Sequence, residues 1–165
     1  MVRLKSTIFP SFFNIIYVDA KERFDCLKEI EKYIKESKIS ETQYRRIWKA
    51  MFYGSFLFGI QVYCKGLWAA DKMKVQMEVA MTIAQMVHLF EGETMITWMS
   101  AGFEIFHREW DKLDYWRTSK FLSLARFCLN EVYLFLEKKN FNGKVRIVNT
   151  IFKPLFSLSR DGIKC

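Results

Sequence analysis

Glycine and proline are scarce in this sequence, with 7 and 2 copies among 165 residues. Sandwiches and barrels with many strands need frequent turn residues, so this scarcity argues against them. No two cysteines form the C-x-x-C pair that begins many zinc sites, and the chain has only two histidines. We therefore expect reduced, mostly buried thiols, no metal and no cofactor. The cysteines are Cys26, Cys64, Cys128 and Cys165.

Common enzyme motifs are missing as well. The sequence contains no phosphate loop of the G-x-x-x-x-G-K type, no G-x-G-x-x-G turn and no G-x-S-x-G elbow. His107 lies near Glu104 and Asp111, a grouping that would suit a general base with an orienting carboxylate. Both spacings are ordinary for one helix surface, and no nucleophile is close in the sequence. We therefore expect that the protein is not an enzyme and has no small-molecule substrate. Among three hypotheses about its function, a helical enzyme that uses His107 ranks last.

Apolar runs long enough to span a membrane are also absent. The uncharged run at residues 50–64 has 15 residues, whereas a spanning helix needs roughly 20. The first 20 residues combine a basic start with an apolar stretch at residues 7–18, as signal peptides do. Pro10, Ser11 and Asn14 weaken that pattern. A secreted or membrane-associated helical protein of unknown role is the second hypothesis.

Apolar residues make up 51% of the chain and recur with the spacing of helices. Residues 21–37 place apolar and charged side chains on opposite faces. Ser40 and Gln43 form a capping-box pattern before the next helix, and Asp71 and Asp114 are suited to cap two later ones. The five predicted helices occupy residues 21–37, 41 onward, 71–90, 94–107 and 114–139.

The predicted helices each carry one broad apolar stripe. In the helix at residues 71–90 the inward stripe is expected to be Met73, Met77, Ala80, Ala84 and Val87. Such helices pack as antiparallel pairs. The predicted fold is therefore all-α, a HEAT-like α-solenoid fragment built from antiparallel helix pairs, with an irregular helical bundle as the alternative. No repeat of fixed period distinguishes the two.

Charge is unevenly distributed along the chain, whose net charge is +8. Residues 117–165 contain ten lysines and arginines and three acidic residues, whereas residues 91–116 contain two and six. A basic end favours an anionic partner, with RNA first and a membrane surface second. Trp116 could then stack on RNA bases, whereas Trp110 is expected to be buried at a helix corner.

Three stretches resemble the eukaryotic ribosomal RNA-processing protein 1 family, the Nop52-type nucleolar proteins. They are "YRRIWKAMFY", "LWAADKMKVQMEVAMTIAQMVHLF" and "FEIFHREWDKLDYWRTSKFLSLARFCL", and "KERFDCLKEIEKYI" is similar to the family's first helix. Together they cover about residues 19–140. "ADK" before a glutamine-containing helix and "REWDKLDYWRTSKF" are the most specific parts.

The resemblance implies a non-catalytic scaffold in the nucleus and nucleolus. It implies a role in large ribosomal subunit biogenesis and precursor rRNA processing, with pre-60S assembly factors and precursor rRNA as partners. The family offers no catalytic residues to carry over. We take as candidate contacts to RNA or partner proteins the following basic residues: Arg45, Lys49, Lys72, Arg108, Lys112, Arg117 and Lys120.

Departures from the family pattern define the predicted domain organisation. We expect one helical domain over residues 1–165 with an atypical N-terminal segment at residues 1–18. Residues 54–66 look inserted between two motifs that the family joins almost directly, and residues 141–165 form a poorly determined tail. The chain stops where family members usually continue, which suggests a shortened or alternatively spliced product, or an imperfect gene model.

Overall fold

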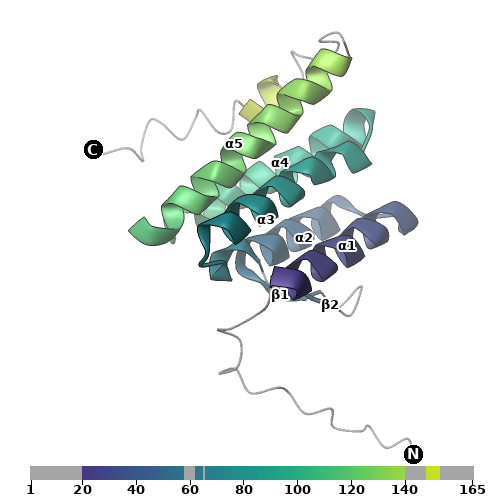
Figure 1. Cartoon of the computed structure of the whole chain (residues 1–165). Coiled ribbons are helices and arrows are strands. Elements are labelled where there is room, and N and C mark those ends of the chain that lie inside the picture. Colours follow the sequence, from purple (N-terminus) through teal and green to yellow (C-terminus); the bar gives the residue numbers. More distant parts are fainter. Residues whose placement is uncertain (1–19, 58–61, 65, 140–147, 153–165) are drawn as a thin grey trace, which may run out of the picture.

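The structure is a computed structural model that describes residues 20–57, 62–64, 66–139 and 148–152. The predictions for residues 1–18 lie outside the described part, as do those for most of residues 141–165. Five long helices dominate, which confirms the all-α class (Figure 1). They are α1 (Ala20–Glu36), α2 (Glu41–Tyr53), α3 (Met73–Gln85), α4 (Gly92–Trp110) and α5 (Tyr115–Lys138). Shorter helical turns are η2 (Leu67–Ala69), η3 (Met86–Leu89) and η4 (Val148–Phe152).

A small β-hairpin follows α2 and was not predicted. Strand β1 (Ser55–Leu57) pairs antiparallel with β2 (Val62–Cys64), and Ser55 lies opposite Cys64. Gly54 has a φ of 85°, a conformation that glycine adopts readily, so α2 ends there and the chain changes direction. Residues 54–66 therefore contain paired strands, and their status as an insertion stays a prediction.

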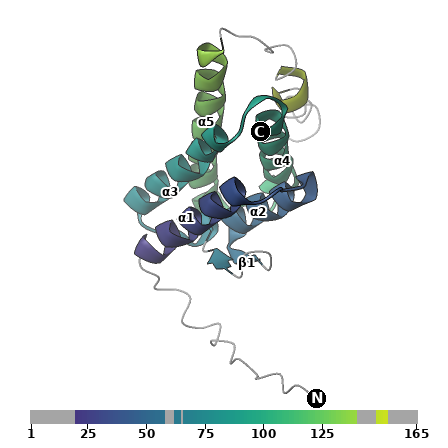
Figure 2. The ribbon, with the colours of Figure 1, turned by 90° about the vertical axis from the view of Figure 1, so that its right-hand side faces the viewer.

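The helices form two layers. α1 packs on α3 and α3 on α5, while α2 packs on α4. Figure 2 shows α1, α3 and α5 on one side and α2 and α4 on the other. This alternation is expected of stacked helix pairs.

Polar contacts establish the direction of neighbouring helices within each layer. Arg45 bonds to Glu104 and Tyr53 bonds to Glu109, so α2 and α4 run parallel. Lys120 reaches Ala70 before α3, and Glu131 reaches His88 after it, so α3 and α5 also run parallel. These contacts do not distinguish the HEAT-like solenoid from an irregular helical bundle, so the solenoid stays a prediction.

Buried aromatic rings pack within and between the two layers. The indole N–H of Trp48 donates to the carbonyl of Trp98 at 2.9 Å, and the two rings lie 5.1 Å apart. The ring of Phe52 in α2 stacks on that of Phe121 in α5, with their centres 3.9 Å apart. This contact joins the layer of α2 and α4 to the layer of α1, α3 and α5. All four side chains are fully buried, so they supply much of the apolar area removed from water.

Two of the predicted helix caps are confirmed. The Asp114 carboxylate accepts from the Arg117 backbone N–H at 2.9 Å at the start of α5. The Gln43 side chain accepts from the Ser40 backbone N–H at 2.8 Å, which is the returning half of the capping box. The prediction for Asp71 is wrong, because α3 begins one residue later with Lys72 in the capping position.

The buried face of α3 also differs from the prediction. Met73 and Met77 are exposed, although the sequence placed them inward. Ala80, Ala84 and Val87 are buried as predicted, and Val79 and Ile83 are buried as well. The helix has apolar residues on more than one face, so periodicity alone does not select the buried one.

Among the described residues, no helix combines the length and the apolar character that a membrane span requires.

Gly102 of α4 lies directly under the indole ring of Trp48. A Cβ atom at this position would lie 2.5 Å from Cε2 and 2.6 Å from Cζ2 of Trp48. We expect Gly102→Ala to lower the free energy of unfolding by about 1–3 kcal/mol, because a buried ring must shift. Urea unfolding followed by circular dichroism measures this change.

A double-mutant cycle isolates the cause of that loss. Trp48→Phe removes the part of the indole ring that Gly102→Ala would strike, so the double variant should lose less stability than the sum of the single variants. Strict additivity would show that the loss does not come from this contact.

Candidate nucleic-acid interface

The segment at residues 66–70 connects the hairpin to α3 and is held by two buried cations. Arg23 of α1 donates to the carbonyl of Gly66 at 3.1 Å and to that of Ala69 at 2.7 Å. Lys120 of α5 donates to the carbonyls of Trp68 at 2.6 Å and Ala70 at 2.8 Å. Buried carbonyls need donors, so this segment is fixed by helices distant in sequence.

Lys120 is buried, which does not suit the contact to RNA or a partner protein that the sequence suggested for it. Burial lowers the pKa of Lys120 to about 8, since a charged ammonium group is disfavoured away from water. Its Nζ atom points at backbone carbonyls of the connecting segment. We therefore assign it a structural role.

Arg117 packs on the same segment from the first turn of α5. Its guanidinium carbon lies 4.5 Å from the centre of the Trp68 ring, within the range of a cation–π contact. The guanidinium also pairs with the Asp114 carboxylate. Arg117 is partly exposed, so its outer edge remains available to a ligand.

Glu109 of α4 is a buried carboxylate with three donors. Lys112 Nζ lies 2.6 Å away, the Tyr53 hydroxyl 2.9 Å and Arg108 Nε 3.0 Å. Burial by itself would raise the pKa of Glu109, but these hydrogen bonds outweigh it and hold the pKa at about 2. Burial of Tyr53, together with its hydrogen bond to Glu109, raises the pKa of that phenol to about 12.

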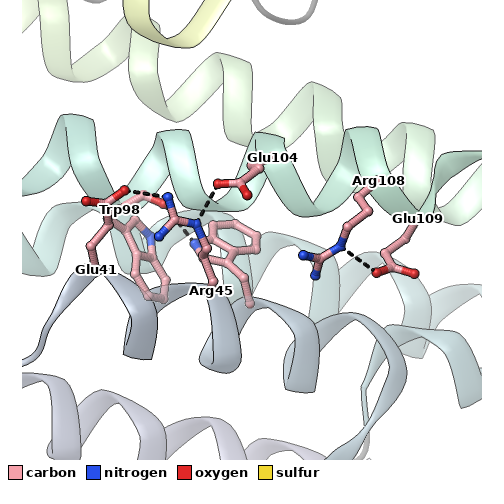
Figure 3. Close-up of polar contacts among 7 residues, drawn as sticks. Glu41, Arg45, Trp98, Glu104, Arg108 and Glu109 are labelled. Atoms are coloured by element: carbon pink, nitrogen blue, oxygen red, sulfur yellow. Dashed lines mark hydrogen bonds and ion pairs between the residues drawn. The ribbon is translucent and has the colours of Figure 1, made fainter.

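Arg45 occupies the seam between α2 and α4. Figure 3 shows it between Glu41 and Glu104, with Nε 2.6 Å from a Glu104 carboxylate oxygen. The Nη2 atom of Arg45 lies 2.5 Å from a carboxylate oxygen of Glu41. Arg108 lies one turn beyond Glu104 on the same side of α4 (Figure 3). Two acidic partners reduce the net charge that Arg45 presents to a ligand.

Lys49 and Lys72 are both exposed. Within the described ranges, neither takes part in an ion pair. Of the seven predicted contacts, these two present the least compensated charge.

Most of the predicted residues gather at one end of the stack. We call this the link end; it comprises the last turns of α2 and α4, residues 66–72 and the first turn of α5. The rings of Tyr53 and Trp68 lie 5.0 Å apart and join the Glu109 group to the Trp68 group. Arg45 lies further along α2, towards the other end. The predicted residues at or near the link end are Lys49, Lys72, Arg108, Lys112, Arg117 and the buried Lys120.

Sequence reasoning missed two features of this end. Arg23 was read as a charged residue on an outer face, and no local pattern indicates its carbonyl partners 43 and 46 residues away. Tyr115 was not considered as a contact, although it lies beside Trp116 directly after the Asp114 cap. Trp110 packs against the core while part of it stays exposed, which agrees with the preference for burial.

The described part of the chain contains no group of three or more His, Cys, Asp or Glu side chains placed to hold a metal ion.

Comparison with known proteins identifies the family. Residues 14–160 match the family described as nucleolar protein, Nop52. The chain belongs to the Nop52 family. The match covers most of the chain and includes every helix of the two layers, so the family resemblance seen in separate motifs extends across the whole fold.

Several relatives of this Nop52-family chain carry names that refer to ribosomal RNA. A ribosomal RNA processing protein 1 homolog from Drosophila melanogaster is 30% identical over 132 residues, which are 76% of this chain and 18% of that protein. A homolog from Dictyostelium discoideum is 27% identical over 122 residues, 73% of this chain and 22% of that protein. Homolog A from Homo sapiens is 34% identical over 87 residues, 52% of this chain and 16% of that protein. The chain thus spans about a fifth of the length of these relatives.

Replacing Lys120 with methionine tests the role of its ammonium group. Lys120→Met keeps much of the apolar side chain but leaves the carbonyl of Trp68 without this donor. We expect the free energy of unfolding to fall by about 1–3 kcal/mol. Lys72→Met, an exposed lysine near the same segment, should change it by less than about 0.5 kcal/mol. Equal effects in urea unfolding would contradict a specific role for Lys120.

Glu109→Gln tests the buried carboxylate through its pH dependence. The folded pKa is below the unfolded value of 4.5, so the charged form stabilises the fold above pH 4.5. We expect the variant to be less stable than the native chain at pH 7 by about 1–3 kcal/mol, and the difference to shrink as the pH falls from 4.5 towards 2.

Thermal unfolding at a series of pH values measures the Glu109 effect. Glu29→Gln, at an exposed position on α1, serves as the control and should be nearly neutral throughout. A Glu109→Gln difference that stays constant from pH 7 to pH 3 would rule out ionisation as its cause.

Proposed function

We propose that this chain acts as a non-catalytic scaffold in large ribosomal subunit biogenesis and precursor rRNA processing. The observation that carries the proposal is membership of a family of nucleolar proteins, together with relatives named for ribosomal RNA processing. We place the chain in the nucleolus, where it binds assembly factors of the large-subunit precursor and precursor rRNA. The link end supplies the contacts.

The charge distribution at the link end supports an anionic partner. Arg108 and Lys112 keep 49% and 61% of their side-chain surface exposed while they neutralise Glu109. Lys49 and Lys72 add exposed charge on α2 and before α3. Partly exposed cations of this kind bind phosphate groups. Such binding weakens as the salt concentration rises, because the release of counterions from the nucleic acid then contributes less free energy.

Rigidity of the layers supports a scaffold role. The stacked rings of Phe52 and Phe121 join the two layers, and Arg23 of α1 and Lys120 of α5 both hold residues 66–70. A surface carried on such a frame keeps its cations at fixed separations. That property suits a protein that holds RNA and protein components in place.

Charge reversal tests the proposal. We expect Lys49→Glu with Lys72→Glu to reduce co-sedimentation with large-subunit precursor particles from nuclear extract several-fold, since both changes repel phosphate. The matched control is Lys28→Glu with Lys32→Glu, which makes the same change in net charge on exposed positions of α1. Precursor rRNA in the gradient fractions is measured at several salt concentrations.

The control separates a local effect from a change in overall charge. Equal losses in both double variants would point to net charge alone and count against the link end. Absence of the native chain from all precursor particles, in a preparation shown to be folded, would overturn the proposed function.

A further inference from the structure

Two neighbouring aromatic side chains at the link end are almost fully exposed. Tyr115 and Trp116 show 85% and 83% of their surface to solvent, the highest values among the exposed large apolar residues of the described chain. Aromatic side chains bury a large apolar area when they are covered, so leaving two uncovered side by side forgoes that stabilisation. The exposed pair is therefore a candidate contact surface for a ligand.

The pair is held on a rigid support. The ring centres lie 5.6 Å apart at an angle of 81°, an edge-to-face contact. The first turn of α5 is fixed by the Asp114 cap and by the Thr118 hydroxyl, which donates to the Asp114 carbonyl at 2.8 Å. An edge-to-face contact covers one face of one ring only, so flat ring faces remain open to a planar ligand.

Cations lie on both sides of the pair along the chain. Lys112 is bound to Glu109, and Arg117 is bound to Asp114 and packed on Trp68. Lys72 lies two residues beyond Ala70, whose carbonyl accepts from Lys120 in the second turn of α5. The carboxylates of Glu109 and Asp114 are engaged by these cations, whereas Asp111 and Asp71 are exposed acidic neighbours.

The surroundings favour a nucleic acid over a protein partner. The core of a protein–protein interface is a continuous apolar area. Here polar residues flank the two rings along the chain, and the next exposed apolar residue of α5 is Leu122, more than a turn away. Met73, the next most exposed apolar residue, stands between Lys72 and Lys74 in the sequence. Isolated aromatic faces next to cations are typical of single-strand binding, where bases stack and phosphates pair with Lys or Arg.

We propose that Tyr115 and Trp116 stack on unpaired bases of single-stranded RNA, while Lys72, Lys112 and Arg117 contact its phosphates. The proposal rests on the proposed function and specifies the kind of RNA bound, since stacking on these rings requires bases that are not in a duplex. Stacking does not depend on base identity, so we expect little sequence preference.

Binding of oligoadenylate of about 12 nucleotides tests the stacking, a length within the range of known single-strand sites. Fluorescence anisotropy of the labelled RNA gives the affinity of the full chain. We expect Tyr115→Ala and Trp116→Ala each to weaken binding on the order of 10-fold. Tyr133→Ala, at another exposed aromatic position on α5, is the matched control and should bind as the native chain does.

Salt dependence distinguishes the rings from the cations. Lys72→Ala should reduce the slope of log affinity against log salt by about 0.7, the value for one phosphate contact on a single strand. Tyr115→Ala and Trp116→Ala should weaken binding while leaving that slope unchanged. A duplex of the same length should bind more weakly than the single strand and should be insensitive to the aromatic substitutions.

Several outcomes would overturn the inference without touching the proposed function. One is native affinity in the Tyr115→Ala, Trp116→Ala double variant. Another is failure of the native chain to bind oligoadenylate although it co-sediments with precursor particles. If the double variant leaves those particles while RNA affinity is unchanged, the pair contacts a protein. Circular dichroism verifies that every variant is folded.

Discussion

The clamp on residues 66–70 is the interaction on which the arrangement of the helices depends. Arg23 and Lys120 approach this segment from α1 and α5, and each donates to two carbonyls. Burying a cation is costly unless hydrogen bonds replace water, and here the cations also satisfy carbonyls that no strand or helix pairs. Gly66 allows this segment to lie close against the end of α2, because a Cβ atom at residue 66 would lie 2.3 Å from the backbone nitrogen of Gly54. One segment thus sets the relative positions of α1, α2 and α5.

The clamp also determines which cations can meet a ligand. Lys120 is withdrawn into the structure, whereas Arg117 packs against Trp68 of the same segment and stays partly exposed. Arg108 and Lys112 neutralise a buried carboxylate and still project outward. The link end therefore separates structural cations from accessible ones within a few residues. Tyr115 and Trp116 are exposed at this end because α5 begins there, capped by Asp114 and turned so that Phe121 and Leu124 enter the core.

Local patterns were reliable where the deciding contact lies within one turn. The Asp114 cap and the Gln43 contact with Ser40 close over three residues, so the sequence contains both partners. Asp71 failed as a cap because α3 begins at Met73, which puts Lys72 in the capping position. The hairpin at Ser55–Leu57 and Val62–Cys64 was missed because three-residue strands are too short to show a period of two.

The sequence by itself determined the helical class, the approximate extent of the five helices and the family motifs, since periodicity and capping act over three or four residues. Tertiary structure decided which face of α3 is buried and which of the basic residues are accessible. Lys120 and Lys112 look alike in the sequence, yet the carbonyls that hold Lys120 lie 50 and 52 residues away. A contact over that distance leaves no periodic trace in the chain, so only the packing of α5 against the connecting segment distinguishes a buried lysine from an exposed one.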